Sequence, residues 1–134
     1  MLLIILLPLA SEIEDFTREW TFTPDSVDYI HMHWLMGSIV DWNAFFSEAY
    51  KACRPGGWVE TLEGFCFIES DHCDLPADSA LSQWSQFFVE GGKKLRRTFL
   101  VLEEEVQRKG MEAAGFVDIQ EIDFKVRSEQ RLFA

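Results

Sequence analysis

The residues from Thr21 to Glu63 constrain the fold more than any other part of this chain, because their pattern predicts a strand, a helix and a second strand. Residues 28–32 form an aromatic and β-branched run after a turn, which is typical of a strand. Apolar side chains then recur with the spacing of one helical face, at Trp42, Phe45, Phe46, Ala49, Tyr50 and Cys53. The sequence Arg54-Pro55-Gly56-Gly57 ends that helix, since proline cannot continue it and glycine accepts a left-handed exit. A strand beginning at Trp58 follows.

This pattern predicts an α/β fold, because two strands joined by a helix form a parallel crossover unit. We expect about four to five parallel strands with helices packed on them. Additional strands are predicted over residues 7–15 and 116–126, and the second strand of the unit either continues through residues 65–68 or pauses at Gly64. Open parallel sheets bind ligands at the carboxyl ends of their strands, which here carry residues 31–34 and 60–63.

The remaining sequence predicts two more helices and no second domain. Asp78 or Ser79 is expected to cap a helix with one apolar face, which comprises Leu81, Trp84, Phe87, Phe88 and Leu95. Gly91-Gly92 is expected to weaken that helix or end it early. Residues 102–114 predict another helix that ends at Gly115.

Charge and composition indicate which kinds of partner and which cellular compartment to expect for this chain. A net charge of −11 argues against nucleic acid or an anionic membrane as a partner. Three irregularly spaced cysteines imply no disulfide framework and favour the cytoplasm or nucleus. The aromatic content (12 Phe and 5 Trp) predicts a protein partner or self-association through exposed apolar sheet surface. Residues 1–10 are apolar, so a buried strand competes with a secretory signal or membrane attachment as their role, although they are too short to span a bilayer.

An ordered set of short motifs extends over roughly residues 12–126. They are Asp15-Phe16, residues 19–26, residues 28–32, residues 48–51, residues 54–57, Ser70-Asp71, Leu75-Pro76, residues 78–81, Trp84 and residues 112–118. Together they resemble a class I S-adenosylmethionine-dependent methyltransferase, of the fungal group that includes a global regulator of secondary metabolism. The resemblance implies a Rossmann-like sheet, S-adenosylmethionine as cofactor, and methyl transfer to a small molecule or a protein.

The chain departs from that family's pattern at both ends. No glycine-rich cofactor loop and no acidic residue after a second strand precede the motifs, and the family's pattern continues past the position of Val126 to a final strand that this sequence does not match. We therefore expect residues 1–134 to form a single partial methyltransferase-like domain, truncated at both ends and lacking the first strand–helix unit that carries the cofactor loop. The alternative is a non-catalytic remnant that acts through protein contacts.

The resemblance also implies cofactor contacts. An acidic residue at the position of Asp15 accepts a hydrogen bond from the adenine amino group, and the next side chain, Phe16, flanks the ring. His31 and Met32 follow the next strand, where the family places residues against the methionine end of the cofactor. An ordinary loop carboxylate and a core phenylalanine are the alternative for the first pair, and a structural role is the alternative for His31.

Candidate acceptor residues lie close by. Methyl transfer from a sulfonium needs mainly orientation and a desolvated cavity, and some acceptors also need a base. His31 and Glu63 are candidate bases, and His33, Trp34 and Glu60 are candidate substrate contacts. We expect only one of the two histidines to face a cleft, and we expect Trp34, Trp42 and Trp58 to lie in the core. No metal site is predicted, because the His and Cys residues lack a recognised ligand spacing.

Overall fold

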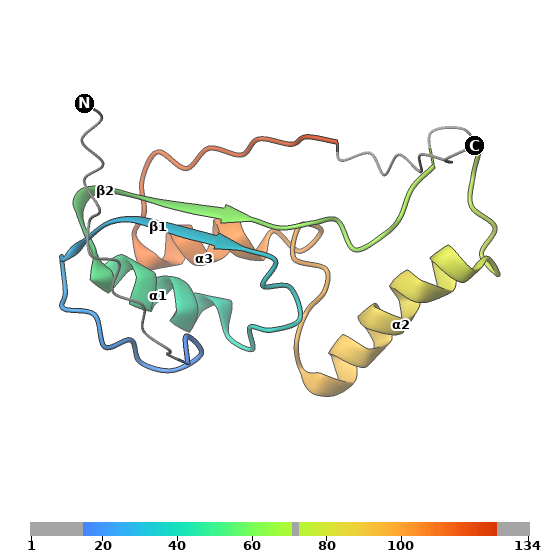
Figure 1. The fold of residues 1–134 in the computed structure, drawn as a ribbon, viewed down its shortest axis with the longest axis horizontal. Helices are drawn as coiled ribbons and strands as arrows, with labels where there is room; N and C mark the ends of the chain where they lie inside the picture. The colour runs from blue at the N-terminus through green and yellow to red at the C-terminus, as the bar shows by residue number, and fades with distance from the viewer. Residues whose placement is uncertain (1–14, 71–72, 126–134) are drawn as a thin grey trace, which may run out of the picture.

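The computed structural model describes residues 15–70 and 73–125. The strand predicted over residues 7–15 and the alternatives for residues 1–10 therefore lie almost entirely outside the described residues. The described chain is α/β, as expected, and its elements follow in the order β1 (Val27–His33), α1 (Trp42–Ala52), β2 (Cys53–Leu62), α2 (Ala80–Leu95) and α3 (Val106–Ala114). Figure 1 shows β1 and β2 side by side, with α1 and α3 next to them.

The two strands run parallel, which confirms the predicted crossover unit. Tyr29 lies opposite Trp58, and the pairing continues without interruption to His33 opposite Leu62. Near the start of the ladder the register shifts, because residues 54–57 form an irregular segment of β2 in which Gly56 adopts a φ of 79°. β2 ends at Leu62, so residues 65–68 do not prolong the strand.

In the described residues the sheet has two strands, β1 and β2, so the predicted four to five strands are not shown. Residues 116–125 were expected to form a strand and form none. Asp118 adopts a left-handed φ of 56°, which interrupts an extended run, and no strand in the described part of the chain pairs with this segment. Its first residue, Phe116, instead packs edge-on against Tyr50 of α1.

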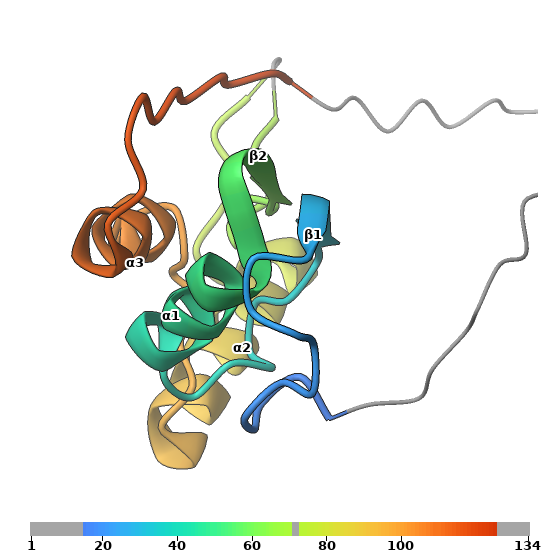
Figure 2. The same ribbon diagram turned by 90° about the vertical axis from the view of Figure 1, so that its left-hand side faces the viewer.

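α1 and α3 cover one face of the sheet, as Figure 2 shows. The Asp41 side chain begins α1 by accepting a hydrogen bond from the Ala44 amide at 2.9 Å. The apolar side chains of α1 form part of the hydrophobic core, which comprises Met32, Ile39, Trp42, Phe45, Phe46, Val101 and Met111. α3 contacts α1 at Gly110, where an added Cβ would lie 2.5 Å from the Phe46 ring. Gly115 ends α3 with a φ of 104°, as predicted.

The other face of the sheet is open in the described structure. Because side chains alternate along a strand, Met32 points into the core while Tyr29, His31 and His33 stand on the open face. Trp42 lies in the core, as predicted. The same prediction was wrong for Trp34 and Trp58, which are 63% and 68% exposed. Trp58 belongs to the open face, and Trp34 follows the end of β1.

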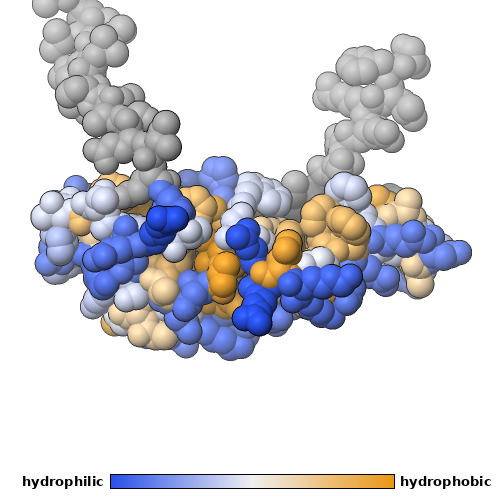
Figure 3. Space-filling view, turned by 90° about the horizontal axis from the view of Figure 1, so that it is seen from below, coloured by the Kyte–Doolittle hydropathy of each residue, from blue (hydrophilic) through white to orange (hydrophobic). Residues whose placement is uncertain are grey.

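α2 extends away from the sheet (Figure 1). Its predicted start is confirmed, since the Ser79 hydroxyl accepts a hydrogen bond from the Ser82 amide. Gly91 and Gly92 do not end it early, because Gly92 is buried beside Phe99 and the helix continues to Leu95. Its apolar face is largely uncovered, and apolar patches stand among polar side chains in Figure 3. No helix of the described residues combines the length and the apolar character needed to cross a membrane.

Candidate functional site

A groove of about 530 Å³ runs alongside β1. Its lining combines most of β1 with aromatic side chains from the preceding loop and from α1: Phe16, Trp20, Phe22, Val27, Tyr29, Ile30, His31, Met32, His33, Leu35 and Phe45. Ile30 and Met32 pack in or against the core, and this packing fixes the strand that forms one side of the groove. The groove therefore brings together four predicted site residues, namely Phe16, His31, Met32 and His33.

Aromatic packing positions the other side of the groove. The rings of Phe16 and Trp20 both meet Phe45 of α1 edge-on, with centroids 6.2 and 5.6 Å from it. The indole N–H of Trp20 donates to the Phe16 carbonyl at 3.0 Å, and its backbone N–H donates to the Glu48 carboxylate at 3.1 Å. These contacts attach the loop before β1 to α1, so Phe16 is held opposite the strand.

Three polar side chains are linked on the open face of the sheet. Glu60 of β2 lies directly opposite His31. One of its oxygens accepts the Tyr29 hydroxyl at 2.5 Å and lies 2.8 Å from Nδ1 of His31. These two hydrogen bonds, that from Tyr29 first, lower the pKa of Glu60 and favour its carboxylate form. When Nδ1 donates to this carboxylate, Nε2 of His31 is the proton acceptor.

His33 stands beside His31, with ring centroids 5.4 Å apart. The expectation that only one of the two histidines faces a cleft was wrong. Residues two apart on a strand share a face, so His31 and His33 both stand on the open face and both line the groove.

Glu63 secures the chain where it leaves β1. Its two carboxylate oxygens accept the backbone N–H groups of Leu35 and Met36, at 2.7 and 3.0 Å. Burial raises the pKa of this carboxyl, while the two amide hydrogen bonds oppose that shift. Glu63 is not among the residues that line the groove, so the structure shows it holding a loop rather than facing the cavity.

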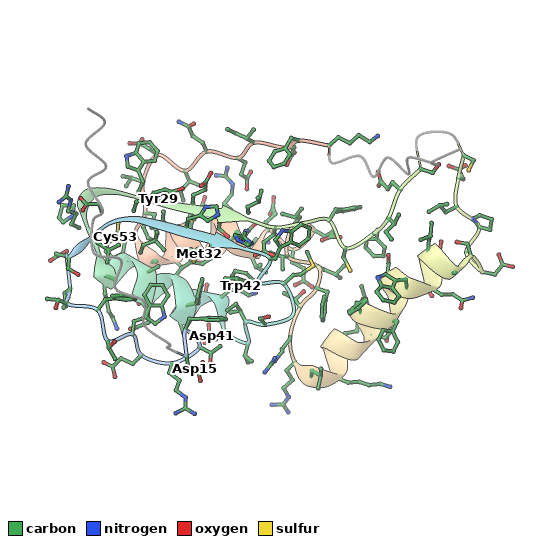
Figure 4. All side chains as sticks on the ribbon, in the orientation of Figure 1. Asp15, Tyr29, Met32, Asp41, Trp42 and Cys53 are labelled. Atoms are coloured by element: carbon green, nitrogen blue, oxygen red, sulfur yellow. The ribbon has the colours of Figure 1, made fainter. Side chains whose placement is uncertain are left out.

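The remaining predicted residues lie around the groove rather than in its lining. Asp15 is exposed and begins a turn, where its carboxylate accepts the Thr17 amide and hydroxyl at 3.1 and 2.6 Å and pairs with Arg18. The hydrogen bonds from Thr17 are the main cause that lowers the pKa of Asp15. Figure 4 shows Asp15 on the loop, apart from Tyr29 and Met32 on β1.

Trp34 and Met32 are the remaining predicted site residues. Trp34 has a left-handed φ of 55° and packs its ring against Gly64, outside the groove lining. The Met32 side chain is buried in the core, so only a small part of it reaches the groove. In residues 15–70 and 73–125, no three or more His, Cys, Asp or Glu side chains gather as a metal site.

The sequence reasoning missed the roles of Tyr29, Trp20 and Phe22 in this site. Tyr29 precedes His31 by two residues, so strand parity alone would have placed it on the same face. Trp20 and Phe22 carried no comparable signal, because their place on the groove depends on packing against Phe45 and each other.

The sequence of this chain is similar to those of fungal regulators of secondary metabolism and of a fungal methyltransferase. The chain is 33% identical to "Secondary metabolism regulator LAE1" of Cochliobolus heterostrophus over 84% of its own length and 36% of that protein. It is 38% identical to the protein of the same name from Hypocrea atroviridis, over 70% of this chain and 27% of the relative. It is 29% identical to "Methyltransferase pytC" of Aspergillus terreus, over 85% of this chain and 34% of the relative.

These matches extend over most of this chain but only part of each relative. The chain spans about a third of the length of the curated relatives it matches. No protein-family model matches it. No solved structure matches it either. Over most of its length the chain is therefore similar to the fungal LAE1-like regulators and methyltransferases.

Proposed function

We propose that this chain acts in S-adenosylmethionine-dependent methyl transfer in fungal secondary metabolism, with a small molecule or a protein as the acceptor. The single observation that carries the proposal is that Phe16, from the loop before β1, and residues 31–33, from the end of β1, line one groove. Its aromatic lining suits a purine ring, and its volume of about 530 Å³ is in the usual range for small-molecule sites. The names of the relatives support a role in methylation and in secondary metabolism.

In this proposal one end of the groove binds the adenine ring of the cofactor and the other end binds its methionine part. Phe16 flanks the adenine ring, and the neighbouring Asp15 carboxylate retains lone pairs that can accept the adenine amino group. Met32 and His31 lie toward the methionine end. When bound, the cofactor supplies an electrophilic methyl group on a positively charged sulfur.

The polar residues on the open face then serve the acceptor. Nε2 of His31 accepts a proton from an acceptor O–H or N–H, while Glu60 positions the ring through Nδ1. His33 and the exposed Trp34 contact the acceptor around this base. Glu63 remains a weaker candidate for the base, because backbone amides occupy both of its oxygens.

A second candidate is a non-catalytic protein that acts through protein contacts. The exposure of Trp58 and Leu62 on the open face of the sheet favours it.

For either function we propose a cytoplasmic or nuclear protein, with secretion or membrane attachment through residues 1–10 as the alternative. Recovery of the tagged full chain in membrane or secreted fractions would support that alternative.

Calorimetric titration of S-adenosylmethionine into the full chain tests the first proposal. We expect Phe16→Ala to weaken binding roughly tenfold or more, the loss of about one aromatic contact. Phe67→Ala is the matched control, because both phenylalanines are 40% exposed and only Phe16 lines the groove. Absence of heat at high micromolar cofactor favours the non-catalytic protein, and equal effects of both substitutions exclude this groove as the site.

A further inference from the structure

We infer that α2 is a self-association surface, which pairs in antiparallel orientation with α2 of a second copy of this chain. The inference goes beyond the proposed function and is compatible with it, because no residue of α2 lines the groove beside β1. It follows from the way α2 packs on its own chain, from a gap in its apolar face and from the charges at its two ends.

α2 turns its small side chains toward the rest of the chain and leaves its large apolar side chains uncovered. Ser85 and Gly92 are its buried residues. On the neighbouring face of the helix, Trp84, Phe87 and Leu95 are 59%, 71% and 67% exposed. A helix normally buries its apolar face, and an exposed apolar patch of this kind marks an interaction surface. Figure 1 shows α2 extending away from the sheet, where a second molecule can reach it.

Gly91 leaves a gap in the middle of this apolar face. A Cβ added at Gly91 would meet no atom within 4 Å, so the space above the helix backbone is open. Phe88 lies close to this gap on the same face, and its ring packs on Trp84 and Phe87 with centroids 5.0 and 5.6 Å apart. The face therefore presents an aromatic cluster beside a hollow.

This face is complementary to itself in an antiparallel pair. When Phe88 of one copy lies against Gly91 of the second, the sequence spacing places Trp84 against Leu95 of the second copy. Two-fold symmetry repeats both contacts, so each bulky ring meets a smaller residue. A helix of 16 residues is about 24 Å long, and these contacts lie along much of that length.

Charge favours the antiparallel orientation over the parallel one. Residues 93–97 contain two lysines and two arginines, of which Lys94 and Arg96 form no salt bridge in the described part of the chain. Asp74 and Asp78 precede the helix, and residues 73–92 contain no lysine or arginine. An antiparallel pair brings the basic end of each copy to the acidic end of the other, whereas a parallel pair joins like charges. In a chain with a net charge of −11, the basic end is where a second copy can approach.

Sedimentation velocity of the full chain without cofactor tests this inference. We expect dimers with a Kd of roughly 10–100 µM, because one helix pair is smaller than a standard interface. Trp84→Gln should raise this Kd roughly tenfold or more. Trp58→Gln is the matched control and should leave it unchanged, because Trp58 is also exposed but lies on the open face of the sheet. A chain that stays monomeric would overturn the inference, and so would a dimer that depends on Trp58 as strongly as on Trp84.

The unmodified chain decides the matter even where a variant fails to fold. On dilution, the indole N–H signal of Trp84 should move in NMR spectra while that of Trp58 stays in place. Movement of the Trp58 signal alone would assign the association to the sheet and overturn the inference. Both measurements are made without cofactor, so their outcome is separate from whether the chain binds S-adenosylmethionine.

The orientation of the pair can be measured from Cys73, which is exposed and precedes α2. A spin label on Cys73 is placed in a Cys66→Ser background, because Cys53 is buried and Cys66 only partly so. The labelled chain is then mixed with an isotope-labelled second copy that carries no spin label. We expect broadening of the amide signals of residues 93–97 in the second copy. Broadening at Ala80 instead would identify a parallel pair and overturn the inference.

Discussion

The Nδ1 atom of His31 lies 2.8 Å from a carboxylate oxygen of Glu60, its direct partner on the neighbouring strand. The same oxygen accepts the hydroxyl of Tyr29 at 2.5 Å. One carboxylate on β2 therefore orients two side chains of β1, and hydrogen bonding rather than burial organises this exposed face. In the proposed function, this carboxylate positions His31 as a base through its contact with Nδ1.

Substitution of Tyr29 by Phe should raise the pKa of Glu60, because the Tyr29 hydroxyl is the largest cause that lowers it. A carboxyl with a lowered pKa stabilises the fold above its ordinary pKa of 4.5, and this stabilisation is lost as the pH falls through its pKa in the folded state. Tyr29→Phe should therefore weaken the acid dependence of stability. NMR titration of the Glu60 carboxyl carbon measures the shift. His31→Gln should give a smaller rise, and an unchanged pKa in Tyr29→Phe would contradict the prediction.

Substitution of Glu63 by Gln should destabilise the chain by about 1–2 kcal/mol, because one backbone amide loses its acceptor. The pH dependence of Glu63 has the opposite sign to that of Glu60. Burial raises its pKa, so its contribution to stability falls as the pH rises from 4.5 to its pKa in the folded state. The variant should lack this fall. Urea unfolding at several pH values measures both effects, and a curve that falls as in the original chain would refute the assignment.

Substitution of Gly110 by Ala should destabilise the packing of α3 on α1, because its Cβ would lie 2.5 Å from the Phe46 ring in a fully buried site. Overpacking of this kind costs about 1–3 kcal/mol. Gly91→Ala is the matched control, since Gly91 is also helical and its added Cβ meets open space. That control should gain about 0.5–1 kcal/mol from helix propensity. Thermal unfolding midpoints that move in the same direction for both variants would contradict this packing.

Substitution of Glu48 by Gln should loosen the loop that carries Phe16, because Glu48 accepts the backbone N–H of Trp20 at 3.1 Å. We expect a loss of about 1 kcal/mol in unfolding free energy. Glu90→Gln is the control, because each glutamate pairs with a lysine three residues later, and Glu90 is 65% exposed against 17% for Glu48. The Glu90 variant should change stability by less than about 0.5 kcal/mol. Equal losses would show that the lysine pairs, and not the contact with Trp20, matter.

Local chemistry in the sequence determined the elements of this protein. Strand composition marks β1, a one-sided apolar stripe marks α1, and the Arg54–Gly57 turn separates α1 from the regular part of β2. The start of α2 at Ser79 and the end of α3 at Gly115 follow from capping, which depends on a few neighbouring residues. The short motifs that carry the family resemblance could also be identified from the sequence alone.

Only the tertiary structure decided how these elements meet. The pairing of His31 with Glu60 depends on a ladder register that shifts at residues 54–57, and sequence spacing does not specify such a shift. Phe16 reaches the groove because its ring packs on Phe45, far along the chain. Trp58 is apolar and yet exposed, because no described element covers its face of the sheet. Register, long-range packing and coverage are relations between distant segments, so local sequence patterns do not contain them.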